Sequence, residues 1–149
     1  MSTIRFVGCR DFISDNIRRC EYGFWATHVE AQFADGYLGA HFVGGVEVRP
    51  IGYDTGKFFR QQFVELSVNE QLFEGFLRSQ VGKLYDTLAI SSFVTGRDWQ
   101  APDSWFCSEL IAAALIACGY FSSQLADHVS KITPRDLLLI ISGRQNTGG

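Results

Sequence analysis

The feature that most constrains the fold is an alternation of polar and apolar residues that ends in a tight-turn signal. From Phe24 to Phe33 the residues alternate in hydropathy, which predicts a β-strand with one buried face. Asp35-Gly36 then favours a two-residue hairpin turn. We expect Tyr37–Val43 to return as the antiparallel partner strand, so the chain must build a sheet around this hairpin.

Further apolar or alternating segments extend the expected sheet. Strands are predicted at Thr3–Val7, Val46–Ile51 and Phe59–Val68. The glycine pair Gly44-Gly45 is expected to bend the chain before the second of these strands. Ser14–Arg19 is polar and is compatible with either a helical turn or a loop.

The second half of the chain carries apolar residues at helical spacing. Asn69 is expected to cap a helix that Gly82 ends. Either Asp103 or Ser104 is expected to cap a second helix, which is apolar on one face and which Gly119 ends.

The remaining segments complete the predicted fold class. Tyr85–Phe93 is ambiguous and suits a shorter helix, whereas Gly96–Ser104 is expected to be a loop. Thr133–Asp136 indicates a turn or a helix start, and the apolar run Leu137–Ile141 predicts a buried strand. Strands followed by helices and a last strand predict an α+β fold, in which helices pack on a mainly antiparallel sheet.

Length and composition predict one folded domain. The chain has 149 residues, of which 46% are hydrophobic and 19% are charged, so it is too apolar for an intrinsically disordered protein. We expect a single domain over residues 1–149, with a disordered tail at 145–149. The formal net charge of −3 argues against a nucleic-acid partner, because such proteins usually carry a basic surface.

The sequence also bears on location. It contains no apolar run of the about 18 residues that a membrane helix needs. Its first residues lack the basic and apolar regions of a signal peptide. We therefore expect a cytoplasmic protein without a transmembrane segment, and its oligomeric state is left open.

Cys107 is the first candidate for chemistry. It is expected near the start of the second helix, where unpaired N–H groups and the helix dipole favour a thiolate. A thiolate is a nucleophile, and an imidazole nearby would complete its activation. The alternative is a small buried hydrophobic residue, which is a common role for free cysteine.

Three polar residues on the predicted hairpin form the second candidate. His28 and Glu30 are two residues apart on one strand face, about 6.6 Å apart at Cα. A hairpin turn at Asp35-Gly36 would place Glu30 opposite His41, so all three side chains would share that face. The alternative is a solvated polar face. A metal site formed by these three residues and Cys107 is a further alternative, but the spacing lacks a standard zinc signature, so no metal or cofactor is expected.

Taken together, these segments resemble the NlpC/P60 superfamily of papain-fold cysteine peptidases. The resemblance covers Phe24 to Leu139, and His28 precedes Cys107, which is the order of the circularly permuted, YiiX-like branch and its small phage-encoded members. The matching strings are Trp25 to Glu30, Asp35-Gly36, Gly44 to Val46, Arg49-Pro50, Gly82 to Asp86, Trp105 to Leu110 and Thr133-Pro134. Where many permuted members place a Glu before an Ala on the returning strand, this chain has Gly39-Ala40.

The resemblance implies a permuted papain-like fold and a thiol hydrolase site. It assigns Cys107 as the nucleophile, His28 as the base and Glu30 as the residue that orients the base, with His41 as the alternative. Tyr85 matches an active-site tyrosine that can help to polarise the acyl oxygen; the other interpretation is an aromatic helix cap.

Three functions follow as alternatives. The first is a cysteine peptidase or amidase, with peptidoglycan peptides as the substrate that the superfamily suggests and release by phage lysis or in a virion. The second is a lipid-directed acyltransferase or thioesterase. The third is a non-catalytic phage component that binds a partner. The expected ligand is a peptide or acyl substrate.

Overall fold

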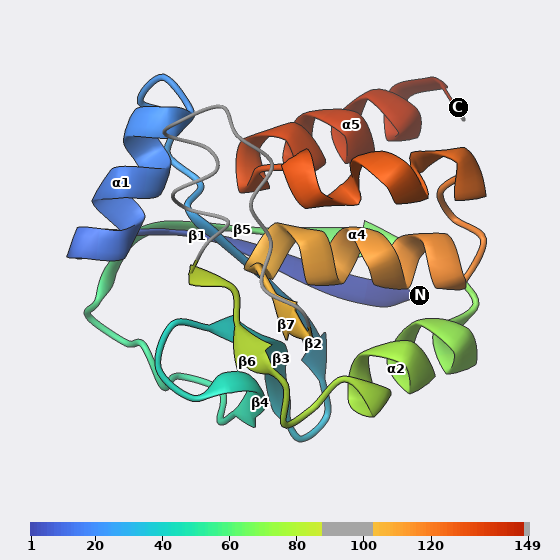
Figure 1. Ribbon diagram of the computed structural model, residues 1–149, viewed down its shortest axis with the longest axis horizontal. Coiled ribbons are helices and arrows are strands. Elements are labelled where there is room, and N and C mark those ends of the chain that lie inside the picture. The colour runs from blue at the N-terminus through green and yellow to red at the C-terminus, as the bar shows by residue number, and fades with distance from the viewer. Residues whose placement is uncertain (88–102, 148–149) are drawn as a thin grey trace.

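A computed structural model describes residues 1–87 and 103–147 of the chain. Its main sheet has five antiparallel strands in the order β4-β3-β2-β1-β5 (Figure 1). The strands are β1 (Ser2–Cys9), β2 (His28–Phe33), β3 (Gly36–His41), β4 (Gly45–Arg49) and β5 (Phe58–Leu66). The strands predicted at Thr3–Val7, Val46–Ile51 and Phe59–Val68, and the predicted hairpin, are therefore confirmed, with shifted bounds.

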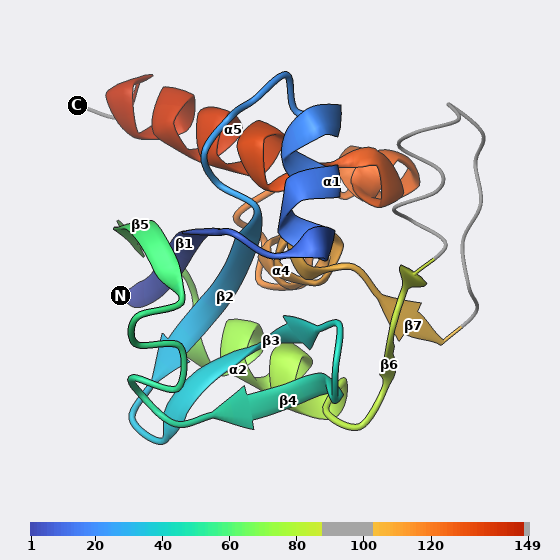
Figure 2. The same cartoon turned by 90° about the vertical axis from the view of Figure 1, so that its left-hand side faces the viewer.

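Helices cover one side of the sheet. Figures 1 and 2 show α4 between α2 on one side and η1 with α5 on the other. A short parallel pair of strands, β6 and β7, leads into α4. The elements are α1 (Phe12–Cys20), α2 (Glu70–Ser79), β6 (Leu84–Tyr85), β7 (Ser104–Trp105), α4 (Cys107–Ala117), the 3₁₀ helix η1 (Ser123–Lys131) and α5 (Pro134–Thr147). The α+β class is thus as predicted.

The two faces of the sheet differ in chemistry. On β1, Ile4 and Phe6 are fully buried in the hydrophobic core. Arg5 lies between them in sequence and so points to the opposite face, where it is also buried. Its register partner is Glu30 on β2. The sheet therefore buries an apolar face under the helices and a charged cluster on its other face.

α4 is enclosed over most of its length. It is apolar nearly all round, as expected for a helix buried on several sides. Its N-cap is Phe106, with no side-chain hydrogen bond, so the predicted caps Asp103 and Ser104 are wrong. Ser104 instead lies in β7, because the chain stays extended until it reaches the buried Cys107.

The hairpin turns one residue earlier than predicted. Phe33 pairs with Gly36, so the turn residues are Ala34 and Asp35. Gly36 has φ +145° and opens β3, where a Cβ would lie 2.2 Å from the carbonyl oxygen of Arg49. The close approach of β4, rather than the turn itself, is what requires this glycine.

The predicted strand at Leu137–Ile141 is wrong, because these residues belong to α5. Thr133 and Asp136 form a reciprocal capping box, with Oγ1 of Thr133 accepting from the Asp136 N–H at 3.1 Å and a carboxylate oxygen of Asp136 accepting from the Thr133 N–H at 3.3 Å. Pro134 occupies the first helical position, which suits proline. α5 runs to Thr147, so residues 145–147 of the predicted tail are helical.

The remaining secondary-structure predictions are confirmed only in part. Ser14–Arg19 is helical and lies within α1. Asn69 caps α2 through its side chain, but that helix ends at Ser79 rather than at Gly82. Tyr85 ends β6, and the rest of the predicted helix and loop, at 88–93 and 96–102, lies outside the described residues.

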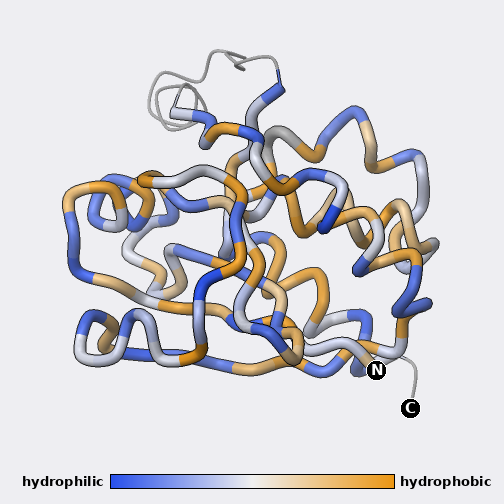
Figure 3. The backbone as a smooth tube through the Cα atoms, turned by 90° about the horizontal axis from the view of Figure 1, so that it is seen from below, coloured by the Kyte–Doolittle hydropathy of each residue, from blue (hydrophilic) through white to orange (hydrophobic). Residues whose placement is uncertain are grey.

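Hydropathy changes frequently along the backbone, as the short orange and blue segments of Figure 3 show. None of the helices within the described ranges combines the length and the apolar character that crossing a bilayer requires.

Candidate active site

His28 opens β2 and contacts Glu30 two residues further along the same strand face. The distance from His28 Nε2 to Glu30 Oε2 is 3.2 Å. The Glu30 side chain is fully buried, and the His28 side chain is 16% exposed. The alternating pattern predicted this pair, because residues two apart on a strand point the same way.

Cys107 opens α4 and lies next to His28. Its side chain interacts with the His28 ring and contributes to the raised pKa of His28. The first turn of α4 has no side-chain cap, so its free N–H groups and dipole act on the sulfur position directly. The structure thus brings together the three residues Cys107, His28 and Glu30.

The neighbours of His28 favour its protonated form. Burial lowers the pKa of His28, but hydrogen bonds to Cys107 and Glu30, with the negative charges of both groups, outweigh burial and raise that pKa to about 10. Burial also raises the pKa of Glu30, but the contacts with His28 and Arg5 outweigh this effect and lower it. His28 therefore stands as an imidazolium beside the Glu30 carboxylate.

Glu30 is held by two further donors that the sequence analysis missed. Arg5 Nη1 donates to Glu30 Oε1 at 2.8 Å, and the Tyr53 hydroxyl donates to Glu30 Oε2 at 3.0 Å. Arg5 also donates to Asp54 at 3.1 Å and to Gln61 at 2.9 Å. The cluster contains two carboxylates and one guanidinium, so an imidazolium at His28 balances its charge.

His41 lies beside the other two polar residues, although not in the predicted register. Extending the observed pairing puts Glu30 opposite Gly39, where an added Cβ would approach the Glu30 Cβ to 3.0 Å. The predicted pairing of Glu30 with His41 is therefore wrong by two residues. A shift of two keeps every side chain on its own face, which is why His41 still reaches the cluster.

The His41 ring is neutral. Its centroid is 4.9 Å from that of His28. Burial, followed by the positive charges of His28 and Arg49, lowers the pKa of His41 to about 2. Its Nε2 is 3.8 Å from Glu30 Oε2, beyond hydrogen-bond distance. Glu30, rather than His41, is therefore the residue that orients His28.

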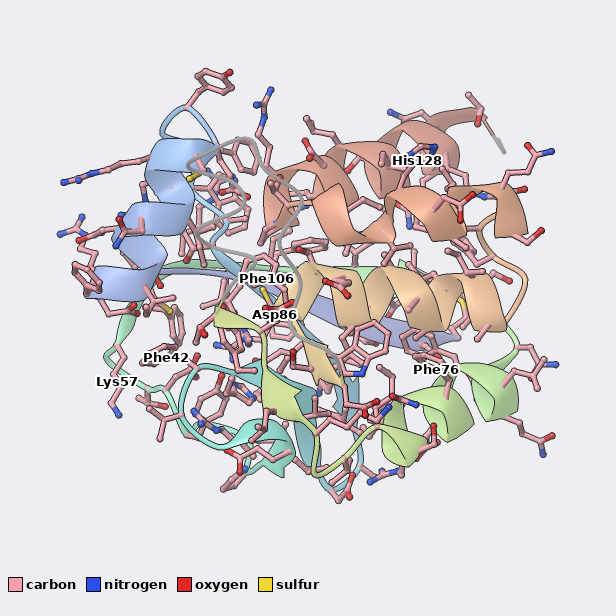
Figure 4. The ribbon with its side chains drawn as sticks, viewed as in Figure 1. Phe42, Lys57, Phe76, Asp86, Phe106 and His128 are labelled. Atoms are coloured by element: carbon pink, nitrogen blue, oxygen red, sulfur yellow. The ribbon has the colours of Figure 1, made fainter. Side chains whose placement is uncertain are left out.

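Tyr85 forms part of the wall beside the site. Its ring packs edge-on against Phe106 and Phe42, with centroid distances of 5.8 and 5.9 Å. Burial, then the negative charges of Cys107, Asp11 and Asp86, raise the pKa of Tyr85. The phenol is therefore neutral and keeps a proton to donate. Figure 4 places Phe106 and Asp86 at the start of α4.

A cavity of about 950 Å³ opens beside His28, between α1, the end of β3 and the segment between β4 and β5. His28, His41 and Tyr85 line it, and Phe42 and Lys57 lie on this side of the molecule below α1 in Figure 4. Its aromatic walls are Phe12, Phe42, Tyr53, Phe58, Phe59 and Tyr85, and its basic residues are Arg10, Arg49 and Lys57. The lining suits a ligand with a large apolar part.

Cys107 itself is 1% exposed and does not line the cavity. A ligand in the cavity meets His28 and Tyr85 first. Reaction at the sulfur therefore requires a small movement of one of these side chains, and small reagents should reach the sulfur more easily than large ones.

Glu109, in the first turn of α4, is buried, with 8% of its surface exposed. Burial, then the charge of the fully buried Asp86, raise the pKa of Glu109 to about 7. The burial of this carboxyl shows that α4 is covered on more faces than its apolar stripe alone.

Comparison with protein-family models gives no match, and comparisons with curated proteins and with solved structures give none either. Membership of the NlpC/P60 superfamily, and the permuted papain-like fold, therefore stay predictions. The site has to be interpreted from its own geometry.

Proposed function

We propose that this protein is a thiol hydrolase that uses Cys107 as nucleophile, His28 as general base and acid, and Glu30 as the residue that positions His28. The observation that carries the proposal is the chain of contacts from Cys107 through His28 to Glu30. A nucleophile, a base and a group that orients the base are the parts that covalent acyl transfer needs.

The proposed reaction proceeds in two halves. In the reactive form His28 already holds the proton of the Cys107 thiol, and the thiolate attacks a carbonyl carbon to form a tetrahedral intermediate. Free N–H groups in the first turn of α4, with the Tyr85 hydroxyl, stabilise the oxyanion. His28 then protonates the leaving group as its bond to carbon breaks. Water, deprotonated by His28, attacks the acyl-enzyme and restores the thiol.

Two substrate classes fit this chemistry. The superfamily resemblance favours an amide bond, in the first place that of a peptidoglycan peptide. The aromatic lining of the cavity favours a second candidate, an acyl ester or thioester whose apolar chain occupies the cavity. Turnover of peptide amides and of acyl 4-nitrophenyl esters, measured side by side, discriminates between them.

The test of the site itself is labelling by a small thiol electrophile, followed by intact mass from pH 5 to 9. We expect one fast site that persists below pH 7, disappears in Cys107→Ala and slows in His28→Ala. Cys118→Ala is the matched control, because Cys118 is the partly buried residue that caps the other end of the same helix.

Loss of the fast site in Cys118→Ala, or labelling of Cys107 no faster than that of an ordinary thiol of pKa about 8.5, would overturn the catalytic assignment. The non-catalytic binding function would then be the better interpretation of the cavity.

A further inference from the structure

His41 is a buried polar group that the proposed thiol chemistry does not use. Its side chain is 5% exposed. Its Nε2 has no hydrogen-bond partner within the described part of the chain, although it is directed at Glu30. A buried polar group without a hydrogen-bond partner destabilises the folded state. A cation that accepts the lone pair of His41 Nε2 would satisfy this nitrogen and stabilise the folded state.

The neighbours of this nitrogen are themselves metal-ligating groups. One ligand atom from each of His28, Glu30 and His41 lies within 4.8 Å of the others. Two of these separations are 3.2 Å for His28 Nε2 to Glu30 Oε2 and 3.8 Å for His41 Nε2 to Glu30 Oε2. Tetrahedral zinc with bonds of about 2.0–2.1 Å needs ligand atoms roughly 3.3–3.4 Å apart. The separations of both imidazoles from Glu30 are therefore close to the spacing that zinc requires, and all three ligand atoms lie within 4.8 Å of one another.

We propose that His28, Glu30 and His41 form a binding site for a divalent ion of the zinc class. Two imidazoles and one carboxylate are a set of protein ligands that leaves a fourth position for water or another ligand. His28 and His41 both line the cavity, so the fourth position faces the space from which an ion would enter.

The groups around the three ligands support such a site. Arg5 and Tyr53 hold the two oxygens of Glu30, at 2.8 and 3.0 Å, and so fix the direction of its carboxylate. Outer hydrogen bonds of this type orient metal ligands in proteins. Asp54, paired with Arg5 at 3.1 Å, adds a second negative charge that offsets the nearby guanidinium.

Metal binding and thiol chemistry would compete for one ring. If His28 gives Nε2 to the ion, its ring is held by the metal and is no longer free to serve Cys107 as base and acid. On the basis of the proposed function, a bound ion therefore switches the thiol site to a slowly reacting form. This consequence rests on the proposed function, whereas the binding site itself does not.

The test uses the purified full chain and Zn²⁺ alone, with stoichiometry and Kd measured by titration against a chromogenic chelator. We expect one ion per chain and a higher Tm with Zn²⁺. In His41→Gln we expect Kd to rise by more than the roughly 10–100-fold that loss of an outer partner causes. Cys107→Ala is the matched control and should not weaken binding, because Cys107 is not one of the three ligands.

A second measurement on the wild-type chain needs no variant to fold. Co²⁺ bound to two imidazoles and a carboxylate should give visible d–d bands without a sulfur-to-cobalt charge-transfer band. A charge-transfer band, or binding that is lost in Cys107→Ala and kept in His41→Gln, would place the ion on the thiol and overturn the proposal. Absence of stoichiometric Zn²⁺ binding would overturn it as well.

The thiol-site proposal and the metal-site proposal are tested by independent experiments, so either one can fail without the other. Electrophile labelling of the metal-free chain tests the thiol site, and chelator competition tests the metal site. Slower Cys107 labelling at saturating Zn²⁺ in wild type, but not in His41→Gln, supports the switch. Equal labelling rates with and without bound Zn²⁺ would overturn the switch.

Discussion

Arg5 Nη1 donates a 2.8 Å hydrogen bond to Glu30 Oε1, and the two residues are register partners buried where β1 pairs with β2. Glu30 in turn contacts His28 through its other oxygen. Arg5 is therefore a positioning residue: it touches neither Cys107 nor the cavity, but it fixes the carboxylate on which the orientation of His28 depends.

The first prediction concerns Arg5→Met. The substitution leaves Glu30 and Asp54 buried without their cation, and removing one partner of a buried ion pair costs about 3–5 kcal/mol. We expect a loss of that order in the free energy of unfolding, measured with urea and tryptophan fluorescence. Arg60→Met is the control, because Arg60 is exposed on β5 and stacks on Trp25 at 4.2 Å. Equal losses in the two variants would contradict a buried cluster.

The second prediction concerns Glu30→Gln. The hydrogen bond and charge of Glu30 help to raise the pKa of His28 to about 10, so their removal should lower that pKa. The imidazolium is then lost at a lower pH, and the labelling rate of Cys107 should fall, by roughly tenfold or more. Imidazole ¹⁵N NMR across pH measures the shift directly. Glu109→Gln should leave the His28 titration in place, and an unchanged titration in Glu30→Gln would refute the positioning role.

Local patterns in the sequence were enough to place His28 and Glu30 side by side. The alternation of β2 puts His28 and Glu30 on one face whatever the rest of the sheet does. A second local pattern, the preference for asparagine at helix N-caps, placed Asn69 at the start of α2. Arg5 and Asp54 could not be found in this way, because the contacts of Arg5 with Glu30 and with Asp54 join residues that are 25 and 49 positions apart in the chain. A charged residue inside an otherwise apolar first strand was the available signal for Arg5.

In the C-terminal segment, a local pattern was present but was assigned to the wrong type of secondary structure. Leu137–Ile141 is a short apolar run, and periodicity alone does not distinguish a buried strand from a helix at that length. The capping residues Thr133 and Asp136, with Pro134 between them, decide in favour of a helix. In contrast, Phe106 caps α4 without any side-chain bond, so no residue preference could have located that start.

The third prediction separates two roles of Tyr85. If its hydroxyl stabilises an oxyanion, Tyr85→Phe should lower the turnover of an acyl ester by roughly 100-fold. Alkylation of Cys107 forms no oxyanion, so the labelling rate of Tyr85→Phe should stay within about twofold of wild type. Both rates are measured on the same preparation.

Tyr120→Phe is the control for this experiment, because Tyr120 follows α4 at the end away from Cys107. An equal fall in turnover and in labelling in Tyr85→Phe would mean that the ring only shapes the wall of the cavity. That outcome would remove Tyr85 from the proposed mechanism.

The fourth prediction concerns Glu21, which joins the end of α1 to the start of α5. Its Oε1 accepts from the Arg135 N–H at 2.8 Å, whereas its Oε2 is buried without a partner within the ranges that the structure covers. Burial outweighs the hydrogen bonds from Arg135 and Thr133 and raises the pKa of Glu21 to about 8. The folded state therefore favours the protonated carboxyl more strongly than the unfolded state, whose pKa is about 4.5.

The direction of the pH dependence follows from the linkage between proton binding and folding. The contribution of Glu21 to stability is fully present below pH 4.5 and is lost as the pH rises towards about 8. Glu21→Gln keeps an oxygen for the Arg135 N–H and carries no charge, so it should match wild type at pH 5 and exceed it at pH 9, by roughly 2–4 kcal/mol. Urea unfolding at pH 5, 7 and 9 measures the difference.

Glu65→Gln, on an exposed position of β5, should show no such trend. A Glu21→Gln difference that is constant across pH would mean that Glu21 is ionised in the folded protein throughout, and that α5 begins on a carboxylate rather than on a neutral acid.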